Sequence, residues 1–303
     1  MTLMQLKYAV CAAGENSFND ASKKLFISQP SLSNAINSLE KEINLQIFSK
    51  SKTGISLTIE GEEFIGYARQ VLEQFDLLET KYVGAKQNKK KFSVSMQHYT
   101  FAVKAFIETI KHFGMDEFEF EVYEDTTYAL IENVKNHRSE LGILYMNEFN
   151  QNVLQKLLSE YSLEFHPLFD CGLYVYMWKE HPLAKNTEIE LDALMEYPCL
   201  SFAQGEHNSF YFAEEVLSTV PYKKLIKASD RATLLNLMVG INGYTICSGI
   251  LCEELNGSEY VAIKLHSDEK MTIGYIARQD SKISEIGECY LSELKKFKDK
   301  AMV

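Results

Sequence analysis

Short polar side chains crowd one stretch near the start of the chain. Gln29, Ser31, Ser33, Asn34 and Asn37 all fall between positions 29 and 37. Their amides and hydroxyls are short enough to reach the floor of a DNA major groove, where Gln and Asn pair with adenine and Ser pairs with several base edges. A merely solvated helix face usually carries Glu and Lys, because Ser and Asn lower helix propensity. The pattern therefore favours a face that contacts bases over a plain solvated face.

A set of short helices is expected to carry this face. The sequence predicts helices over about residues 3–13 and 18–25, and a third that begins at Ser28 and ends near Asn44. Ser28 can cap the third helix, and Pro30 suits its first turn, where no amide hydrogen is needed. Apolar residues recur at helical period and predict one buried stripe, namely Leu32, Ile36, Leu39 and Ile43. Two helices joined by a tight turn, with the second entering the groove, form a helix-turn-helix.

A small hairpin is predicted after the third helix. Residues 48–58 alternate around Ile55 and Leu57, with a turn at Gly54. Lys50 and Lys52 lie beside that turn and would neutralise DNA phosphates without distinguishing one base sequence from another. The hairpin is therefore expected to act as the wing of a winged helix-turn-helix.

One long helix is predicted from Thr58 to about Lys90, since this stretch lacks proline and has glutamates in its first turns. Within it, apolar residues follow a heptad spacing, namely Phe64, Ala68, Val71, Phe75, Leu78 and Tyr82. This seam favours dimerisation through a partner helix, with packing against its own domain as the alternative. The run Lys89–Lys91 then indicates a solvated hinge.

The charge of the chain is unevenly distributed. The 303 residues carry 31 Lys and Arg against 42 Asp and Glu, a net charge of −11 that by itself disfavours a nucleic-acid partner. Residues 1–91 have a net charge of +2, however, and residues 92–303 have −13. The acidic character therefore belongs to the C-terminal part and leaves DNA binding open to the N-terminal part.

The sequence lacks the signatures of several other classes of protein. No apolar run approaches the roughly 18 residues of a membrane span, no secretory signal is visible, and the cysteines form no C-x-x-C pair. No P-loop, G-x-G-x-x-G, G-x-S-x-G or H-E-x-x-H motif is present. We therefore expect a cytoplasmic protein that is not an enzyme, binds no metal or cofactor and does not associate with a membrane.

The remainder of the chain alternates between strands and helices. Strands are predicted over residues 92–97, 118–123 and 141–146, separated by helices over 101–113 and 128–136. Further strands are predicted over 172–178, 199–202 and 244–248, with helices over 210–217 and 233–239. This order is typical of parallel β-α-β folds, in which ligands bind beyond the carboxyl ends of the strands.

The N-terminal motifs resemble those of the LysR-type transcriptional regulators of bacteria. The densest match is the segment ASKKLFISQPSLSNAINSLE at residues 21–40, and the match continues at Ile47-Phe48, Leu57-Thr58 and Gly61. The family pattern has Ser-Gln-Pro, a later Ser, Leu-Glu, Leu-Phe, and Leu-Thr with a following Gly. This sequence departs from it at Ser22, Asn44, Lys50, Lys52 and Glu60. Lysine neutralises phosphate but lacks the bidentate fork of arginine.

The resemblance implies an α plus α/β fold in three parts. Residues 1–58 would form a winged helix-turn-helix DNA-binding domain, 59–91 a dimerisation helix and hinge, and 92–303 a two-subdomain α/β effector-binding region similar to type 2 periplasmic binding proteins. Subdomain I would comprise 92–163 and 267–303, and subdomain II 164–266, with crossovers near Leu163 and His266. The implied DNA contacts are Gln29, Pro30, Ser31, Ser33, Asn34, Asn37, Lys50 and Lys52.

Effector-binding residues are nominated from the predicted strand ends of this region. They are Gln97, His98, Tyr99, Thr100, Thr127, Ser201 and Gln204. In the family such strand ends hold the effector, whereas the alternative for a Thr or Gln is the capping of a helix. His98 is the titratable candidate facing an acidic ligand, although a lone histidine is more often a structural donor.

The leading hypothesis is a transcriptional regulator that binds a pseudo-palindromic site in double-stranded DNA as a dimer or tetramer. A small-molecule effector, with organic anions among the candidates, would change the geometry of the DNA-bound protein. RNA polymerase would be a further partner. Two alternatives remain: a cytosolic small-molecule binding protein, and a redox-responsive regulator of the same family that uses Cys247 and Cys252.

Overall fold

The chain divides into two compact units, residues 1–88 and 89–303. The computed structural model describes residues 1–51, 54–79, 89–113 and 117–301. The division lies close to the predicted hinge at Lys89–Lys91. Among the described residues, no helix combines the length and the apolar character that a membrane span requires.

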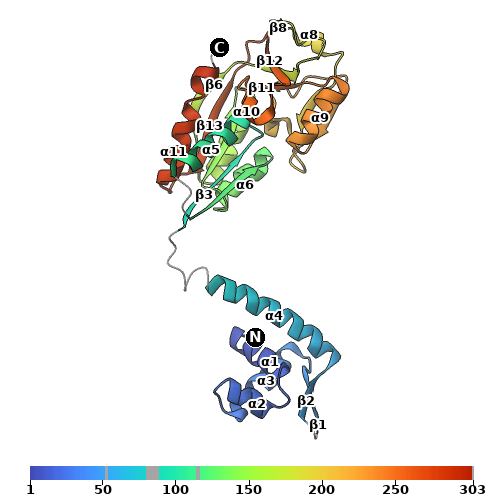
Figure 1. Ribbon diagram of the computed structural model, residues 1–303, viewed down its shortest axis with the longest axis vertical. Helices are drawn as coiled ribbons and strands as arrows, with labels where there is room; N and C mark the ends of the chain where they lie inside the picture. Colours follow the sequence, from blue (N-terminus) through green and yellow to red (C-terminus); the bar gives the residue numbers. More distant parts are fainter. Residues whose placement is uncertain (52–53, 80–88, 114–116, 302–303) are drawn as a thin grey trace. The chain divides into compact units, whose positions relative to one another are not determined.

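The first unit is a helix-turn-helix with a wing and a long helix (Figure 1). Its elements are α1 (Leu3–Ala13), α2 (Phe18–Lys24), α3 (Gln29–Ile43), β1 (Phe48–Ser51), β2 (Gly54–Leu57) and α4 (Ile59–Glu79). Strands β1 and β2 pair in antiparallel fashion, as expected for the wing. The order of elements predicted for this unit is therefore confirmed.

Local signals set the ends of α3. The Ser28 hydroxyl accepts a hydrogen bond from the Ser31 N–H at 3.2 Å, and Pro30 occupies the first turn. Asn44 ends the helix in the left-handed conformation, with φ 51°. The buried face of α3 packs against α1 and α2, and its fully buried side chains are Leu32, Ile36 and Leu39. The predicted stripe therefore faces the core of the unit, and the polar residues between its members face outward.

The seam predicted for α4 does not act as one surface. Ala68 is buried together with Leu6 of α1, and Phe64 packs against the same group. The Lys7 ammonium lies 5.4 Å from the centre of the Phe75 ring. Ala68 is therefore used within its own unit, whereas Phe64 and Phe75 are only partly buried there, so the contact of this seam with a partner helix stays a prediction. Val71 and Leu78 are exposed, and Tyr82 lies outside the described residues.

The helix predicted to run from Thr58 to about Lys90 is described as far as Glu79, and residues 80–88 lie outside the described residues. Its end lies before Lys90, which already belongs to strand β3 (Lys90–Met96). The hydroxyl of Thr58 caps its start by accepting a hydrogen bond from the Gly61 N–H at 2.9 Å. A Cβ at Gly61 would lie 2.1 Å from the Ile47 carbonyl oxygen, so glycine is needed where this helix crosses the segment before the wing.

The second unit contains a five-stranded sheet in the order β4-β3-β5-β13-β6. Strand β3 is parallel to β4 (Phe118–Glu124) and to β5 (Leu141–Met146), which confirms the predicted parallel β-α-β pattern. The other two strands, β6 (Leu163–Cys171) and β13 (Met271–Arg278), pair in antiparallel fashion. Sequence-distant strands therefore complete one sheet.

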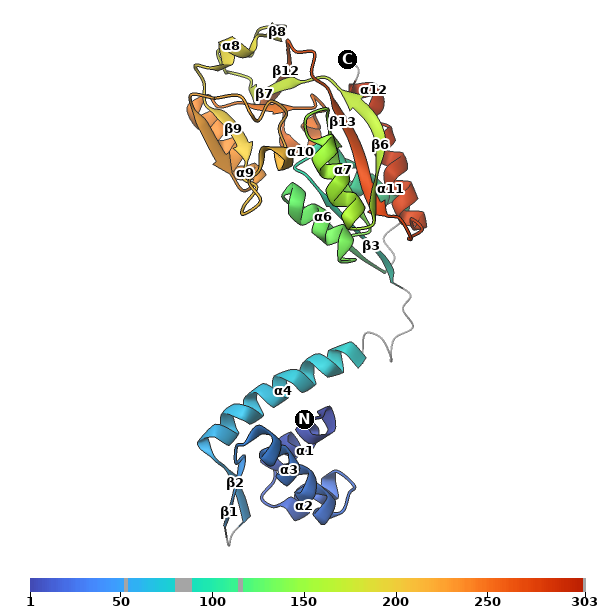
Figure 2. The same ribbon diagram turned by 180° about the vertical axis from the view of Figure 1, so that it is seen from behind.

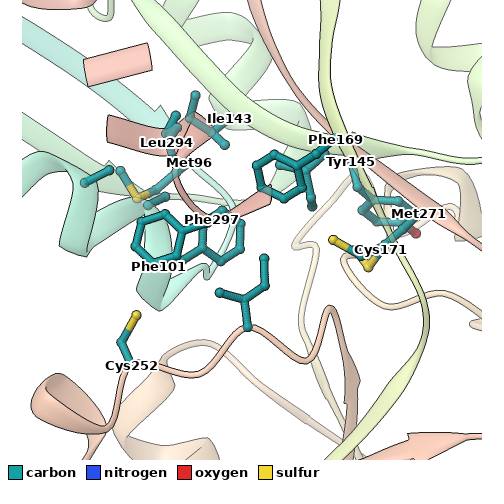
Figure 3. Packing of buried hydrophobic residues seen from close by; sticks show 14 of the residues in the cluster. Met96, Phe101, Ile143, Tyr145, Phe169, Cys171, Cys252, Met271, Leu294 and Phe297 are labelled. Atoms are coloured by element: carbon teal, nitrogen blue, oxygen red, sulfur yellow. The ribbon is translucent and has the colours of Figure 1, made fainter. Parts of the chain in front are cut away.

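Helices cover both faces of this sheet (Figures 1 and 2). Helices α5 (Thr100–Phe113) and α11 (Glu285–Lys295) pack with Ile143 and Tyr145 of β5 on one face. Helices α6 (Thr127–Lys135) and α7 (Gln151–Glu160) pack with Leu144 and Met146 on the other. Alternate residues of one buried strand thus contribute to two apolar layers. Figure 3 shows the first layer, where Phe101, Ile143, Phe169 and Phe297 meet.

A second lobe is inserted between β6 and β13. It contains a four-stranded sheet in the order β11-β7-β12-β8 and a parallel pair formed by β9 and β10. Its strands are β7 (Tyr174–Trp178), β8 (Glu188–Ile189), β9 (Cys199–Phe202), β10 (Leu225–Ala228), β11 (Thr245–Cys247) and β12 (Tyr260–Leu265). Its α-helices are α8 (Leu191–Leu194), α9 (Arg231–Ile241) and α10 (Glu253–Asn256), and α12 (Lys298–Ala301) follows the last strand of the first lobe.

Two predictions for this unit are corrected. The crossovers lie near Cys171 and Met271, which are paired with each other, and not near Leu163 and His266, because β6 belongs entirely to the sheet of the first lobe. The helix predicted over 210–217 is a short 3₁₀ turn over Phe210–Phe212. The following residues are not helical, and the carboxylates of Glu214 and Glu215 accept hydrogen bonds from the backbone N–H groups of His98 and Phe202.

Candidate functional site

The outer face of α3 presents the predicted DNA contacts. Gln29, Pro30, Ser31, Asn34 and Asn37 are exposed, and Ser33 is half-buried. The Gln29 Nε2 donates a hydrogen bond to the Ser33 hydroxyl at 2.9 Å, and the hydroxyls of Ser28 and Ser31 lie 2.7 Å apart. These bonds orient the side chains while leaving the Gln29 carbonyl oxygen and further lone pairs available to a partner. The face therefore offers a pre-oriented set of base-pairing groups.

The side chain of Glu40 attaches the wing to α3. The Glu40 Oε1 accepts hydrogen bonds from the N–H groups of Ile47 and Phe48, at 2.7 and 2.9 Å. The wing strand β1 includes Lys50, whose side chain, like the whole of Lys52, lies outside the described residues. The phosphate contacts of Lys50 and Lys52 thus remain predictions. The Glu40 side chain links the start of the hairpin that carries them to α3.

A buried chain of hydrogen bonds joins the two lobes of the second unit. The Gln97 Nε2 donates to the Thr127 hydroxyl at 2.6 Å, and the Thr127 N–H donates to the Gln204 Oε1 at 3.0 Å. The Gln204 Nε2 donates to the Glu214 Oε1 at 2.9 Å. The other oxygen of Glu214 accepts from the His98 N–H at 2.9 Å. Residues of the first lobe and of the second are thereby bonded to each other directly.

His98 is held on both sides within this chain. Its Nδ1 lies 2.8 Å from the Glu214 Oε2, and its ring stacks on Phe202 with 3.7 Å between ring centres. This geometry matches the structural-donor alternative for His98, and its partner is an acid of the protein itself.

A second link between the lobes lies at the start of α9. The Arg231 guanidinium donates hydrogen bonds to the Thr100 hydroxyl and to the Glu124 carboxylate. The Asn256 Nδ2 donates to the same hydroxyl at 3.0 Å. Arg231 is thus neutralised by a carboxylate of the opposite lobe, so the two lobes meet through an ion pair as well as through amides.

Between these two links lies a cavity of about 80 Å³. Its wall is mainly apolar and aromatic and includes Tyr99, Tyr176, Phe202, Leu234 and Ile250. Its polar residues include His98, Thr100, Glu214, Glu215, Arg231 and Asn256. Burial, and then the neighbouring Glu214, raise the pKa of Glu215 to about 8.

The predicted effector residues fall into separate groups. His98, Tyr99 and Thr100 line the cavity between the lobes, whereas Ser201 and Gln204 line an adjoining one. Gln97 is buried, and its Oε1 accepts hydrogen bonds from the Tyr99 hydroxyl and the Tyr145 N–H at 2.7 and 3.1 Å. Thr127 is equally buried. The polar groups of Gln97 and Thr127 are thus used in hydrogen bonds within the protein, and their direct contact with an effector stays a prediction.

Sequence reasoning missed Glu214, Glu215 and Arg231, which contribute the charges of the cavity. Adjacent glutamates in an expected helix resemble ordinary surface residues, and no local signal marks them as buried. Their tertiary partners distinguish them: Glu214 and Arg231 bond to residues more than a hundred positions away, and Glu215 accepts from the Phe202 N–H of a neighbouring strand.

Burial raises the pKa of several cysteine thiols in the effector-binding unit. Burial raises the pKa of Cys247 to about 11 and that of Cys171 to about 12. Because the thiolate is the species that reacts with peroxide, neither thiol is activated near neutral pH. These values weigh against the redox-responsive alternative that uses Cys247.

Family models match both units of the chain. Residues 3–62 match the bacterial regulatory helix-turn-helix proteins of the lysR family, and residues 99–297 match the LysR substrate binding domain. The chain therefore belongs to the LysR family. It is a transcriptional regulator with a helix-turn-helix DNA-binding domain and an effector-binding domain.

Individual relatives agree with this assignment. The uncharacterized HTH-type transcriptional regulator YbhD of Escherichia coli strain K12 is 25% identical over 296 residues, which cover 96% of this chain and 90% of the relative. The HTH-type transcriptional regulator TfdT of Cupriavidus pinatubonensis is 39% identical over 72 residues, or 24% of this chain and 32% of the relative.

Among solved structures, the Corynebacterium glutamicum OxyR C206 mutant matches with a TM-score of 0.58 and 23% identity. The match covers 99% of this chain and 94% of that one. At this identity the likeness concerns the fold, which agrees with the predicted winged helix-turn-helix followed by a two-lobed α/β region.

Proposed function

We propose that α3 recognises a specific DNA sequence through Gln29, Ser31, Ser33, Asn34 and Asn37. The observation that carries the proposal is the exposure of these short amides and hydroxyls, together with the hydrogen bond that orients Gln29 on Ser33. Pro30 places the first turn of the helix where its side chains can reach base edges. Lys50 and Lys52 on the wing neutralise phosphates.

The test is a selection of bound sequences from a random DNA library, followed by affinity measurements at one salt concentration. Gln29→Ala and Ser33→Ala are expected to lower the preference for the selected sequence, by roughly 1–3 kcal/mol for each base pairing that the variant cannot make. Ser38→Ala is the matched control, because Ser38 is exposed further along α3. Because Gln29 donates to Ser33, the effect of the double variant should be smaller than the sum of the two single effects. Unchanged sequence preference in both single variants would refute the recognition face.

Dimerisation is assigned to the apolar residues of α4 that its own unit leaves exposed. Tyr67, Val71 and Leu78 have 62%, 47% and 54% of their surface exposed and lie on one side of the helix. Such a stripe is stabilised when a partner helix covers it. We therefore centre the proposal on this stripe, which shares Val71 and Leu78 with the predicted seam.

Light scattering of the purified protein tests the dimer stripe. Val71→Asp and Leu78→Asp should shift the protein toward the monomer and weaken binding to paired half-sites, since tethering the second recognition helix adds affinity. Glu73→Lys also changes charge on α4 but lies off the stripe, and it should leave the mass unchanged. A wild-type protein that is already monomeric would contradict the proposal.

The effector-binding unit is proposed to act by changing how its two lobes meet. The buried chain from Gln97 to Glu214 and the ion pair of Arg231 with Glu124 hold the lobes together. A ligand that binds one arrangement of the lobes more tightly shifts the population toward it. The regulator is further proposed to act in the cytoplasm by binding, without catalysis, on a pseudo-palindromic site and in contact with RNA polymerase.

A further inference from the structure

Internal oxygen atoms occupy one backbone donor at or near the start of each of three helices that border the space between the lobes. At the start of α5, the His98 N–H donates to Glu214. At the start of α6, the Thr127 N–H donates to the Gln204 side chain. At the start of α9, the Thr233 N–H donates to the Asp230 carboxylate at 2.8 Å. Helix N-termini of this kind are the usual anion sites of α/β folds, and here an internal oxygen atom takes up one donor of each.

The cavity wall carries two buried acidic side chains. Glu214 and Glu215 both line the cavity and are both more than 90% buried. The cation on the described wall other than the imidazole of His98 is Arg231, and it is paired with Glu124. An incoming carboxylate would therefore meet two buried acids and an arginine whose charge is already used. Burial next to Glu214 also raises the pKa of Glu215, which is the response of an acid that has no cation paired with it among the described residues.

Aromatic rings surround the same space. Tyr99, Tyr176 and Phe202 line the cavity together with leucine and isoleucine side chains. Ring faces attract cations, and the attraction is strongest where water is excluded. A cation placed here would also form an ion pair with Glu215, whose Oε1 accepts a hydrogen bond from the Phe202 N–H at 2.9 Å.

We propose that the effector of this regulator is a protonated amine with an apolar body, bound between the lobes with its ammonium group against Glu215. The inference rests on the proposed role of the cleft as the effector site and specifies its ligand class. It replaces the organic anion considered from the sequence. In a cavity of about 80 Å³, a compact branched body fits better than a long chain. The aromatic wall also favours flat rings once the lobes part.

The experiment uses the full-length protein and ligands that differ in charge but hardly in size. Isobutylamine, isobutanol and isobutyrate form one series, and benzylamine, benzyl alcohol and benzoate form a second. Thermal shift and calorimetric titration at pH 7 give the affinities. In at least one series the amine is expected to bind roughly tenfold more tightly than its alcohol, as expected for a buried cation near rings and an acid, and the carboxylate is expected not to bind.

Glu215→Gln keeps the shape of the side chain and removes its charge. It should abolish the advantage of the amine over the alcohol while leaving the affinity for the alcohol unchanged. Glu148→Gln, an exposed acid in the same lobe as His98, is the control and should leave the amine preference intact. If the Glu215 variant fails to fold, the two ligand series on the wild-type protein still decide the ligand class.

Three outcomes overturn the inference: equal affinities for amine and alcohol, tighter binding of a carboxylate, or no binding in either series. DNA binding measured on the same samples separates this failure from failure of the proposed function. A protein that binds its selected DNA but prefers carboxylates refutes only the ligand class. A protein that fails to bind any selected DNA refutes the recognition face and leaves the ligand result standing.

Discussion

The two units of the chain place their polar candidates in opposite environments. On α3, Gln29 and Asn34 are exposed, and Gln29 bonds to a residue one helical turn away. In the effector-binding unit, Gln97 and Gln204 are buried and bond to residues 30 and 77 positions away. An exposed and locally bonded group acts mainly on a partner molecule, whereas a buried group with distant partners acts first on the stability of its own unit.

The largest effect is expected at Gln97. Gln97→Ala would leave the Tyr145 N–H and the hydroxyls of Tyr99 and Thr127 without their partner, so the unfolding free energy should fall by about 3 kcal/mol or more. Urea denaturation followed by the fluorescence of Trp178, the single tryptophan of the chain, reports on this unit. Gln29→Ala is the counterpart on α3 and should change stability by less than about 0.5 kcal/mol. Equal losses of unfolding free energy in Gln97→Ala and Gln29→Ala would contradict the difference between the two units.

The next effect concerns the pH dependence of the effector-binding unit. The pKa of Glu215 is raised from its ordinary value of 4.5 to about 8, so the folded state binds this proton more tightly than the unfolded state does. The stability that Glu215 contributes is therefore fully present below pH 4.5 and is lost as the pH rises toward about 8. Glu215→Gln has no such proton to lose. Its stability relative to wild type should rise with pH across this window, by on the order of 1 kcal/mol per pH unit.

Urea titrations of both proteins at pH 5, 6.5 and 8, followed by Trp178 fluorescence, measure this difference. Glu148→Gln provides the reference for an exposed acid. A constant difference between Glu215→Gln and wild type at all three pH values would show that Glu215 is not held in its protonated form.

A smaller effect is expected at the cap of the recognition helix. Ser28→Ala removes the hydroxyl that accepts from the Ser31 N–H, and it should lower the stability of the helix-turn-helix unit by about 1 kcal/mol. Far-UV circular dichroism during thermal unfolding measures the loss, with Ser38→Ala as the control on the same helix. The effector-binding unit should be unaffected. A simultaneous loss of the Trp178 transition would show that the two units do not unfold independently.

The smallest expected effect is a gain in the stability of the helix-turn-helix unit. Phe26 lies in the turn between α2 and α3 with φ 56° and 95% of its surface exposed. A bulky side chain is strained in this left-handed region, which asparagine adopts more readily. Phe26→Asn is therefore expected to stabilise the unit by about 0.5 kcal/mol, measured by the same thermal unfolding. A loss of stability would mean that the ring makes contacts within the unit that offset the strain.

The helix-turn-helix unit could be predicted almost element by element. Ser28, Pro30 and Asn44 set the ends of α3 through contacts with immediate neighbours, and the spacing of Leu32 and Ile36 set its buried face. In the effector-binding unit the strands β3, β4 and β5 were predicted as well, because β5 is a continuous apolar run and β3 and β4 alternate apolar with polar residues.

The predictions made from helical spacing failed where side chains contact distant parts of the chain. The helix expected over 210–217 is a short 3₁₀ turn, and Glu214 and Glu215 bond to the backbone N–H groups of His98 and Phe202. The heptad seam of α4 was divided because α1 covers Ala68 but not Val71. Spacing along a helix shows which residues share a side, but it does not show which surface will cover them.

The sequence by itself determined the family motif, the recognition face of α3 and the alternation of strands and helices, because these depend on caps, turns and periodicities within a few residues. Only the tertiary structure decided that Gln97 and Thr127 are internal links, that Glu214 occupies the donor at the start of α5, and that Glu215 has no cation paired with it within the described part of the chain. The physical reason is burial: the charge and hydrogen-bonding state of a side chain depends on what excludes water from it, and those groups come from remote segments.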